Sequence, residues 1–362
     1  MWRWLLSPLA LLLGGILRVR HWAYDHGLFK SYEADVPTLC IGNLTVGGTG
    51  KSPLVADLME RLGTPSGAVV LSRGYGRTTR GFRVVRPSSL AHEVGDEPLQ
   101  LKRRTLGARV AVCEDRVEGC RRIVEEFRDC PCIVLDDAFQ HRRLQASYNI
   151  LLSRFDRPYS RDWLLPVGLL RDVKSAARRA HAIALTNIPA EVTEAEARAL
   201  AETLRTNPRQ RLLFSSIAYD VPRRLEGGVP LGSVCYVPTG GASFVFAGIA
   251  HPQPFFDHLR KVWGVTQMRA YPDHHHFTPK ELAELDALAQ QGVTLFTTEK
   301  DATRLSDALT SYSSLAEHLF YVPIRLVWRW GSELELERIW NEVSQSTRSG
   351  DGAARRGIPP TL

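Results

Sequence analysis

The residues best suited to chemistry lie in the segment TVGGTGKSP, residues 45 to 53. Its residues Gly50, Lys51 and Ser52 match the end of the phosphate-binding pattern G-x-x-x-x-G-K-[ST], although Thr45 stands where the pattern begins with glycine. In such a loop the backbone N–H groups point at phosphate oxygens, the lysine reaches the outer phosphates, and the hydroxyl binds Mg²⁺. The alternative is a glycine-rich turn with no ligand. We predict that the nucleotide contacts are Thr45, Val46, Gly47, Gly48, Thr49, Gly50, Lys51 and Ser52.

Two carboxylates follow an apolar run further along the chain. Residues 132–135 predict a buried strand, and Asp136 and Asp137 come at its carboxyl end. A carboxylate held on a strand beside the loop hydroxyl is what a Mg²⁺ ion bound to phosphates needs. We therefore predict that Ser52, Asp136 and Asp137 hold Mg²⁺.

The elements that must position these residues alternate between strand and helix. An apolar strand at 38–41 precedes the loop, and apolar residues at helical spacing follow it up to Leu62. Further strands are expected at 68–71 and 109–113, with a helix at about 115–127. This alternation predicts an α/β fold with a mostly parallel sheet, like that of phosphate-loop NTPases.

A second, smaller α/β region is expected from about residue 211. Runs at 211–219 and 232–237 resemble the two strands of a β-ribbon between domains, and strand–helix alternation then resumes. The predicted division is a membrane-associated helix at 1–30, a phosphate-loop core at 31–210, a C-terminal α/β domain at 211–343, and a disordered polar tail at 344–362.

The N-terminus carries a charge-free run of fourteen residues, 4–17, between Arg3 and Arg18. A membrane span takes roughly 20 residues, so this run is too short to cross comfortably. A signal peptide would need a small-residue cleavage site, which is not evident, and a buried core helix is the other alternative. We predict a helix that lies in the membrane interface with its apolar side down.

The amino-acid composition limits the kinds of binding partner that we expect. The 46 basic and 39 acidic residues give a net charge of +7, which suits an anionic membrane surface or phosphorylated substrates. The chain lacks zinc-finger spacing, an RNA-binding aromatic motif and a long basic tract, so we expect no nucleic acid partner, and no protein partner is indicated. The six cysteines form no C-x-x-C pair, which predicts reduced, buried thiols in a cytosolic setting.

Seven motifs, in this order, resemble the tetraacyldisaccharide 4′-kinase family of lipid A biosynthesis. They are GNLTVGGTGKSP (42–53), LSRGYGR (71–77), GDEP (95–98), DDAFQHR (136–142), FAGIAHPQPFF (246–256), DHHHF (273–277) and TEKDA (298–302). The similarity extends to about residue 340. It implies a peripheral or monotopic enzyme on the cytoplasmic face of the inner membrane. The enzyme would transfer the γ-phosphate of ATP, with Mg²⁺, to the 4′-hydroxyl of a tetraacyldisaccharide 1-phosphate, a lipid A disaccharide precursor. The family loop T-V-G-G-[ST]-G-K-[ST] also accounts for Thr45.

The resemblance also implies catalytic and substrate residues. Asp96 matches an acid that activates the acceptor hydroxyl, paired with the histidine that matches His251, whereas by itself Asp96 would be interpreted as a helix N-cap. The resemblance also suggests less specific substrate contacts at Arg73, Tyr75, Arg77, Arg116 and Gln140. Each of these residues could equally belong to a turn or a surface ion pair. Asp172 stands where the family usually has glutamate, which leaves a metal-linked role for it open.

Other function classes share the loop. A partitioning-type ATPase would carry a lysine where Val46 stands, and a GTPase would need N-K-x-D, which the chain does not supply. A membrane-bound nucleotide sensor without catalysis stays open. Phosphate transfer to the lipid acceptor, compared with hydrolysis without it, separates these classes.

Overall fold

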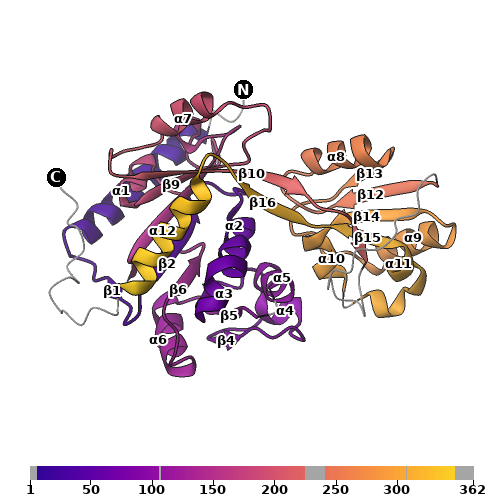
Figure 1. The fold of residues 1–362 in the computed structure, drawn as a ribbon, viewed down its shortest axis with the longest axis horizontal. Helices are drawn as coiled ribbons and strands as arrows, with labels where there is room; N and C mark the ends of the chain where they lie inside the picture. Colours follow the sequence, from indigo (N-terminus) through magenta and orange to yellow (C-terminus); the bar gives the residue numbers. More distant parts are fainter. Residues whose placement is uncertain (1–5, 106, 225–240, 307, 347–362) are drawn as a thin grey trace.

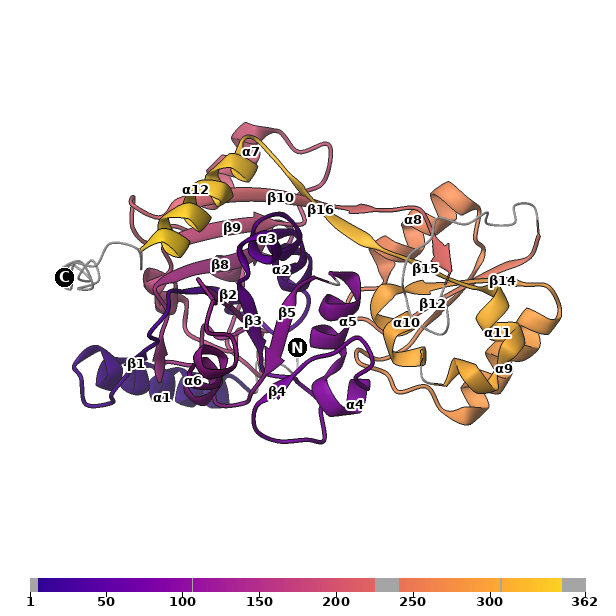
Figure 2. The same cartoon turned by 60° about the horizontal axis from the view of Figure 1, so that its bottom comes forward.

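The computed structural model describes residues 6–105, 107–224, 241–306 and 308–346. Two lobes, each an α/β layered structure, are connected by a pair of antiparallel strands, as Figures 1 and 2 show. The larger lobe is built on a nine-stranded sheet and the smaller lobe on a five-stranded sheet. The predicted α/β fold class with a second, smaller α/β unit is confirmed.

The nine-stranded sheet is parallel except at its two edges, where β16 and β4 run antiparallel to their neighbours. In spatial order its strands are β16 (Ile324–Trp328), β10 (Arg211–Tyr219), β9 (Ala182–Thr186), β8 (Tyr148–Arg154), β2 (Thr38–Asn43), β6 (Ile133–Asp136), β3 (Val69–Ser72), β5 (Arg109–Val112) and β4 (Arg83–Val84). The central strands are buried on both faces, which explains why they read as continuous apolar runs rather than alternating ones.

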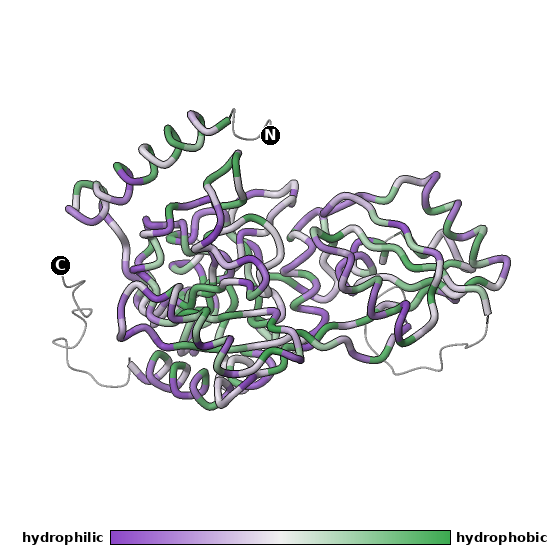
Figure 3. The backbone as a smooth tube through the Cα atoms, turned by 90° about the horizontal axis from the view of Figure 1, so that it is seen from above, coloured by the Kyte–Doolittle hydropathy of each residue, from purple (hydrophilic) through white to green (hydrophobic). Residues whose placement is uncertain are grey.

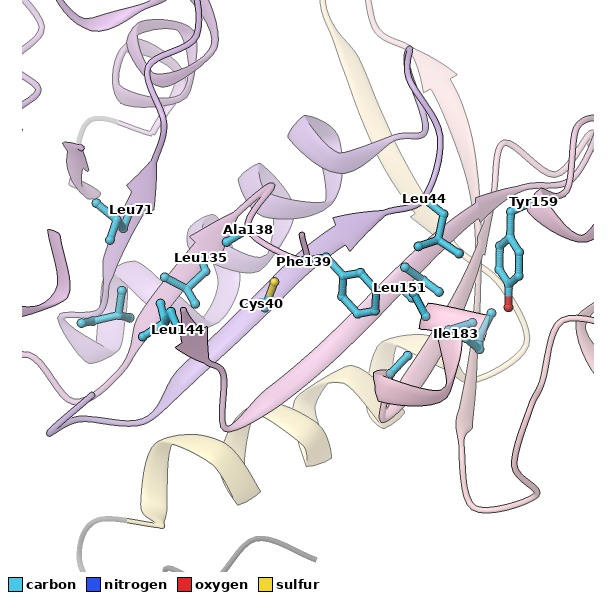
Figure 4. Close-up of a cluster of buried hydrophobic side chains, with 14 of the residues drawn as sticks. Cys40, Leu44, Leu71, Leu135, Ala138, Phe139, Leu144, Leu151, Tyr159 and Ile183 are labelled. Atoms are coloured by element: carbon cyan, nitrogen blue, oxygen red, sulfur yellow. The ribbon is translucent and has the colours of Figure 1, made fainter. Parts of the chain in front are cut away.

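Helices cover both faces of this sheet and create two hydrophobic cores. The helices of this lobe are α1 (Ser7–Asp25), α2 (Lys51–Leu58), continued by the π-helical turn Met59–Gly63, α3 (Thr64–Ser66), α4 (Ala91–Val94), α5 (Asp96–Arg104), α6 (Arg116–Glu126), α7 (Glu194–Glu202) and α12 (Ser332–Gln345), with 3₁₀ turns at Tyr159–Arg161 and Lys174–Arg179. Figure 4 shows part of one core, in which Cys40, Leu135 and Leu151 come from three adjacent strands. A two-stranded sheet pairs β1 (Tyr32–Glu33) with β7 (Leu144–Gln145).

The smaller lobe repeats the layered plan. Its sheet, in spatial order, holds β11 (Arg223–Arg224), β15 (Leu319–Val322), β14 (Thr294–Thr298), β12 (Ser243–Ala247) and β13 (Gln267–Ala270). Its helices are α8 (Gln253–Trp263), α9 (Pro279–Gln290), α10 (Glu299–Leu305) and α11 (Ser313–His318), with a 3₁₀ turn at Leu309–Ser311. Separate hydrophobic clusters line the two faces of the sheet.

The expected domain boundary at residue 211 does not match the sheets. Strand β10 pairs in parallel with β9 of the larger sheet, β16 returns beside β10, and α12 packs its apolar face on the larger core. The antiparallel partner of β10 is therefore β16, and the expected partner at 232–237 lies outside the described residues. Apolar periodicity specifies a strand but not its partner more than 100 residues away, so the sequence assigned β16 and α12 to the wrong lobe. The disordered tail was predicted to begin at residue 344, but α12 continues to Gln345. The rest of the predicted tail, residues 347–362, lies outside the described residues.

Helix α1 lies along the larger lobe, and hydrophobic segments, drawn in green, recur along it in Figure 3. Its exposed large apolar residues are Leu9, Leu11, Leu12, Ile16, Val19 and Trp22. The inner side buries Gly14, His21 and Ala23. Among the described residues, no helix combines the length and apolarity that crossing a membrane requires. Membrane association of α1 stays a prediction.

Candidate active site

The phosphate-binding loop connects the end of β2 at Asn43 to the start of α2 at Lys51. Gly47 and Gly50 have φ angles of 95° and 84°, a backbone conformation that glycine adopts without strain. The strand–loop–helix context expected from the sequence is therefore present. The N-terminus of α2 adds partial positive charge where phosphates would bind.

Hydrogen bonds from neighbouring segments hold this loop in shape. The Asn43 side-chain amide donates to the Thr49 hydroxyl over 2.7 Å, and the Thr186 hydroxyl donates to the Thr49 carbonyl over 2.8 Å. The Val46 amide donates to the Leu169 carbonyl over 2.8 Å. These contacts within the protein support the shape of the loop.

Asp137 is paired with cations rather than left open for a metal. Its carboxylate lies 3.8 Å from the Lys51 ammonium and accepts two hydrogen bonds from the Arg171 guanidinium. Burial by itself would raise the pKa of Asp137, but Lys51 and Arg171 lower it below its ordinary value. Each carboxylate oxygen accepts a hydrogen bond from Arg171, so the geometry supports a role in positioning Lys51, and the role as a metal ligand stays a prediction.

Asp136, in contrast, carries an oxygen that fits a cation. The side chain is 7% exposed, and its Oδ2 accepts a hydrogen bond of 3.0 Å from the Ser72 hydroxyl, while its buried Oδ1 has no hydrogen-bond partner. Burial, with repulsion from Glu97 and Asp137, raises the pKa of Asp136 to about 6. Among the described residues, no group of three or more histidine, cysteine or carboxylate side chains is placed to hold a metal. Because Mg²⁺ at a phosphate site takes most of its ligands from phosphates and water, the predicted role of Ser52 and Asp136 does not need such a group and stays a prediction.

A cavity of about 1260 Å³ opens in front of the loop and is lined by both lobes. The larger lobe contributes the loop, Asp96, Glu97, Asp136 and Asp137, and the smaller lobe contributes His251, His274 and Lys300. Nucleotide pockets are usually smaller, so this cavity has room for a second substrate.

Asp96 is held by groups of the smaller lobe, but His251 is not one of those that bond it. Its Oδ2 accepts a hydrogen bond of 2.7 Å from Arg304 Nε and lies 3.4 Å from His274 Nδ1. Burial opposes ionisation, but His274 and Arg304 together lower the pKa of Asp96 to about 2. The N-cap interpretation is wrong, because Gly95 occupies the cap and α5 has no side-chain cap hydrogen bond.

His251 reaches the site at a different point. A Cβ atom built on Gly47 would lie 3.9 Å from His251 Nε2, so the imidazole faces the phosphate loop. Burial, followed by repulsion from Arg154, lowers the pKa of His251 and keeps it neutral near pH 7. The expected direct contact between Asp96 and His251 is absent between these two described residues. The expectation paired residues from different lobes, and only the docking of those lobes decides which groups touch.

The sequence missed how two of the short motifs meet. Glu97 of GDEP forms an ion pair with Lys300 of TEKDA, and Gln100 donates to Glu299 over 3.0 Å. Together with the Asp96–Arg304 pair, these contacts join α5 to α10 across the lobes. The only signal in the sequence was that TEKDA carries one lysine, Lys300, opposite in charge to the two acids of GDEP.

Four of the five expected substrate residues line the cavity: Arg73, Tyr75, Arg116 and Gln140. Arg77 does not, because its guanidinium forms an ion pair with Glu114 and donates to the Gly81 carbonyl over 2.7 Å. That expectation is corrected to the alternative of a turn held by an ion pair. A charged residue in a motif does not reveal which way its side chain turns.

Asp172 also lies outside the cavity lining. It is fully buried, lies 2.6 Å from His21 Nε2 and accepts a hydrogen bond of 2.8 Å from the Val173 amide. These partners support a structural role for Asp172, and a metal-linked role stays open.

The fold and the site define a phosphate-loop nucleotide-binding protein whose second lobe supplies charged groups to the same cavity. Comparison with known proteins assigns it more closely. The family model described as tetraacyldisaccharide-1-P 4′-kinase matches residues 2–343. The chain belongs to this family.

Individual relatives agree over nearly the whole length. The tetraacyldisaccharide 4′-kinase of Cytophaga hutchinsonii is 37% identical over 327 residues, covering 89% of this chain and 90% of its own. That of Flavobacterium psychrophilum is 35% identical over 347 residues, covering 95% and 98%. The crystal structure of "apo" form LpxK from Aquifex aeolicus in complex with ATP has a TM-score of 0.69 at 27% identity. The structural match covers 94% of this chain and 100% of the Aquifex aeolicus chain.

Proposed function

We propose that this kinase transfers the γ-phosphate of ATP to the 4′-hydroxyl of a tetraacyldisaccharide 1-phosphate in lipid A biosynthesis. The family and the names of the relatives support this acceptor. The observation that carries the proposal is the cavity itself, in which a preformed phosphate loop faces groups from both lobes.

The nucleotide end of the cavity has the parts that phosphoryl transfer needs. The amides of loop residues 45–52 would hold the phosphates, and Lys51, steadied by Asp137, would reach the outer ones. Ser52 and Asp136 would hold Mg²⁺, which neutralises developing phosphate charge when it is bound. The buried Asp136 Oδ1 without a hydrogen-bond partner supports this metal position.

Asp96 and His251 are proposed to act on the acceptor hydroxyl from two sides without touching each other. Asp96 is ionised at neutral pH and can accept the hydrogen bond of a hydroxyl, which orients it for attack. Neutral His251, facing Gly47, can accept a proton as the oxygen attacks the phosphorus. We propose that Arg73, Tyr75, Arg116 and Gln140 contact the sugar or its 1-phosphate, because all four line the cavity.

The acceptor is a lipid, so the protein is proposed to work at the cytoplasmic face of the inner membrane, bound peripherally or monotopically. The apolar outer side of α1 supports this location, because Leu11 and Val19 are 73% and 66% exposed. Arg20 and Tyr24 of the same helix line the cavity, so the helix borders both the proposed membrane and the site.

The test is to incubate the full chain with ATP, Mg²⁺ and tetraacyldisaccharide 1-phosphate in mixed micelles. We expect a new phosphomonoester on the lipid, seen by ³¹P NMR and mass spectrometry, with ADP release that requires the acceptor. ADP release at the same rate without acceptor would show a hydrolase instead. Nucleotide binding without any turnover would show a sensor.

A further inference from the structure

Helix α1 is connected to the phosphate loop by two lines of hydrogen bonds that meet at Asn43. In the first line, Arg20 Nη2 donates to the Gln140 carbonyl over 3.0 Å, and the Gln140 side-chain amide donates to the Asn43 carbonyl over 2.8 Å. Asn43 in turn holds Thr49 inside the loop. A residue of the outer helix is thus two side chains away from the nucleotide site.

The second line runs through the buried pair of His21 and Asp172, whose Nε2 and Oδ1 atoms are 2.6 Å apart. The next residue, Arg171, donates to Asn43 Oδ1 over 2.5 Å and holds the Asp137 carboxylate. Its backbone amide also donates to the Leu44 carbonyl over 2.9 Å. The segment 169–172 therefore transmits the position of His21 to both the loop and the partner of Lys51.

The neighbours of His21 determine which atom donates in its hydrogen bond with Asp172. Arg142 Nη1 lies 3.2 Å from His21 Nδ1, and a guanidinium can only donate. His21 Nδ1 is therefore the acceptor, which leaves Nε2–H to donate to Asp172. His21 is 6% exposed and Asp172 is fully buried, so water does not compete for this bond.

We propose that His21 is a positioning residue of the ATP site, which sets the phosphate loop through Asp172, Arg171 and Asn43. A surface that holds the outer side of α1 would by the same contacts hold the loop. The inference rests on the proposed function in taking ATP as the ligand of this loop. It concerns binding, and its test needs no lipid acceptor.

The test compares three variants of the full chain in detergent micelles. His21→Ala removes the second line. His21→Gln keeps a donor toward Asp172 and an acceptor toward Arg142. The matched control, Arg178→Ala, removes an ion pair between the 3₁₀ turn at 174–179 and Asp25 of α1, but leaves both lines in place. Hydrogen exchange of residues 45–52 and the dissociation constant of ATP are measured for each.

In His21→Ala we expect faster exchange of the loop amides and an ATP dissociation constant raised about 5- to 10-fold, the lower range of coupling between linked sites. His21→Gln should return both values to within about 2-fold, and Arg178→Ala should match the unaltered protein. Unchanged loop exchange and ATP affinity in His21→Ala would overturn the proposal. An equal effect of Arg178→Ala would also overturn it, because loose docking of α1 would then be the cause.

Should the alanine variant not fold, His21→Asn replaces it, because its amide falls short of Asp172. Equal ATP affinity of the asparagine and glutamine variants would refute the positioning role. If ATP binding follows these expectations but no phosphate is transferred to the lipid, the positioning role of His21 holds and only the proposed lipid acceptor is rejected.

Discussion

Replacing Asp96 by asparagine should cost stability whose size follows from its ion pairs. Arg304 and His274 depress the pKa of Asp96 from 3.8 to about 2. One pKa unit corresponds to 1.36 kcal/mol, so the ionised carboxylate contributes about 2 kcal/mol to the free energy of unfolding near neutral pH. The side chain is only 15% exposed, so solvent screens little of this contribution.

The pH dependence has a definite sign. A carboxyl whose pKa is lowered by folding stabilises the protein above its unfolded value near 4, and this contribution is lost as the pH falls toward 2. Asp96→Asn should therefore be about 2 kcal/mol less stable at pH 7, and the difference from the unaltered protein should shrink below pH 4. Urea unfolding of both proteins, followed by circular dichroism at pH 7 and at pH 3, measures this difference in the free energy of unfolding.

Glu284→Gln is the matched control, because Glu284 pairs with Arg269 at the surface with 46% of its side chain exposed. We expect it to change the free energy of unfolding by less than about 0.5 kcal/mol. Equal losses in the two variants, or a loss in Asp96→Asn that is as large at pH 3 as at pH 7, would refute the ion-pair reasoning. If Asp96 also orients the hydroxyl, turnover should fall about 10²- to 10⁴-fold at pH 7, far beyond any loss of folded protein.

Three further outcomes test the other parts of the site. Lys51→Ala should abolish transfer while its circular dichroism spectrum stays unchanged, and near-normal turnover would reject the phosphate-loop role. The apparent affinity for Mg²⁺ should weaken below about pH 6, because protons then compete for the Asp136 carboxylate. Asp136→Asn should make this pH dependence weaker, to that of the nucleotide phosphates alone, as a Mg²⁺ titration of turnover would show. In a double-mutant cycle on turnover, Asp96→Asn with His251→Gln should cost little more than the worse single change, whereas additive losses would mean that the two groups do not act on the same step.

The sequence by itself determined the local elements of the nucleotide site. The loop, the strand before it and the helix after it have their own patterns, because apolar spacing and glycine positions act over a few residues. Strand β6 with Asp136 at its end was predictable for the same reason, since a strand buried on both faces must be apolar throughout. The order of the motifs then indicated the family.

Only the tertiary structure decided which distant groups meet. In the structure Asp96 contacts His274 and Arg304 rather than His251. Arg77 pairs with Glu114, and Asp172 is buried against His21. It also placed β16 and α12 in the larger lobe. Such partners lie tens to hundreds of residues apart, and no local preference selects them. They are selected by how well whole elements pack and by which charges that packing leaves without water, which is a property of the complete fold.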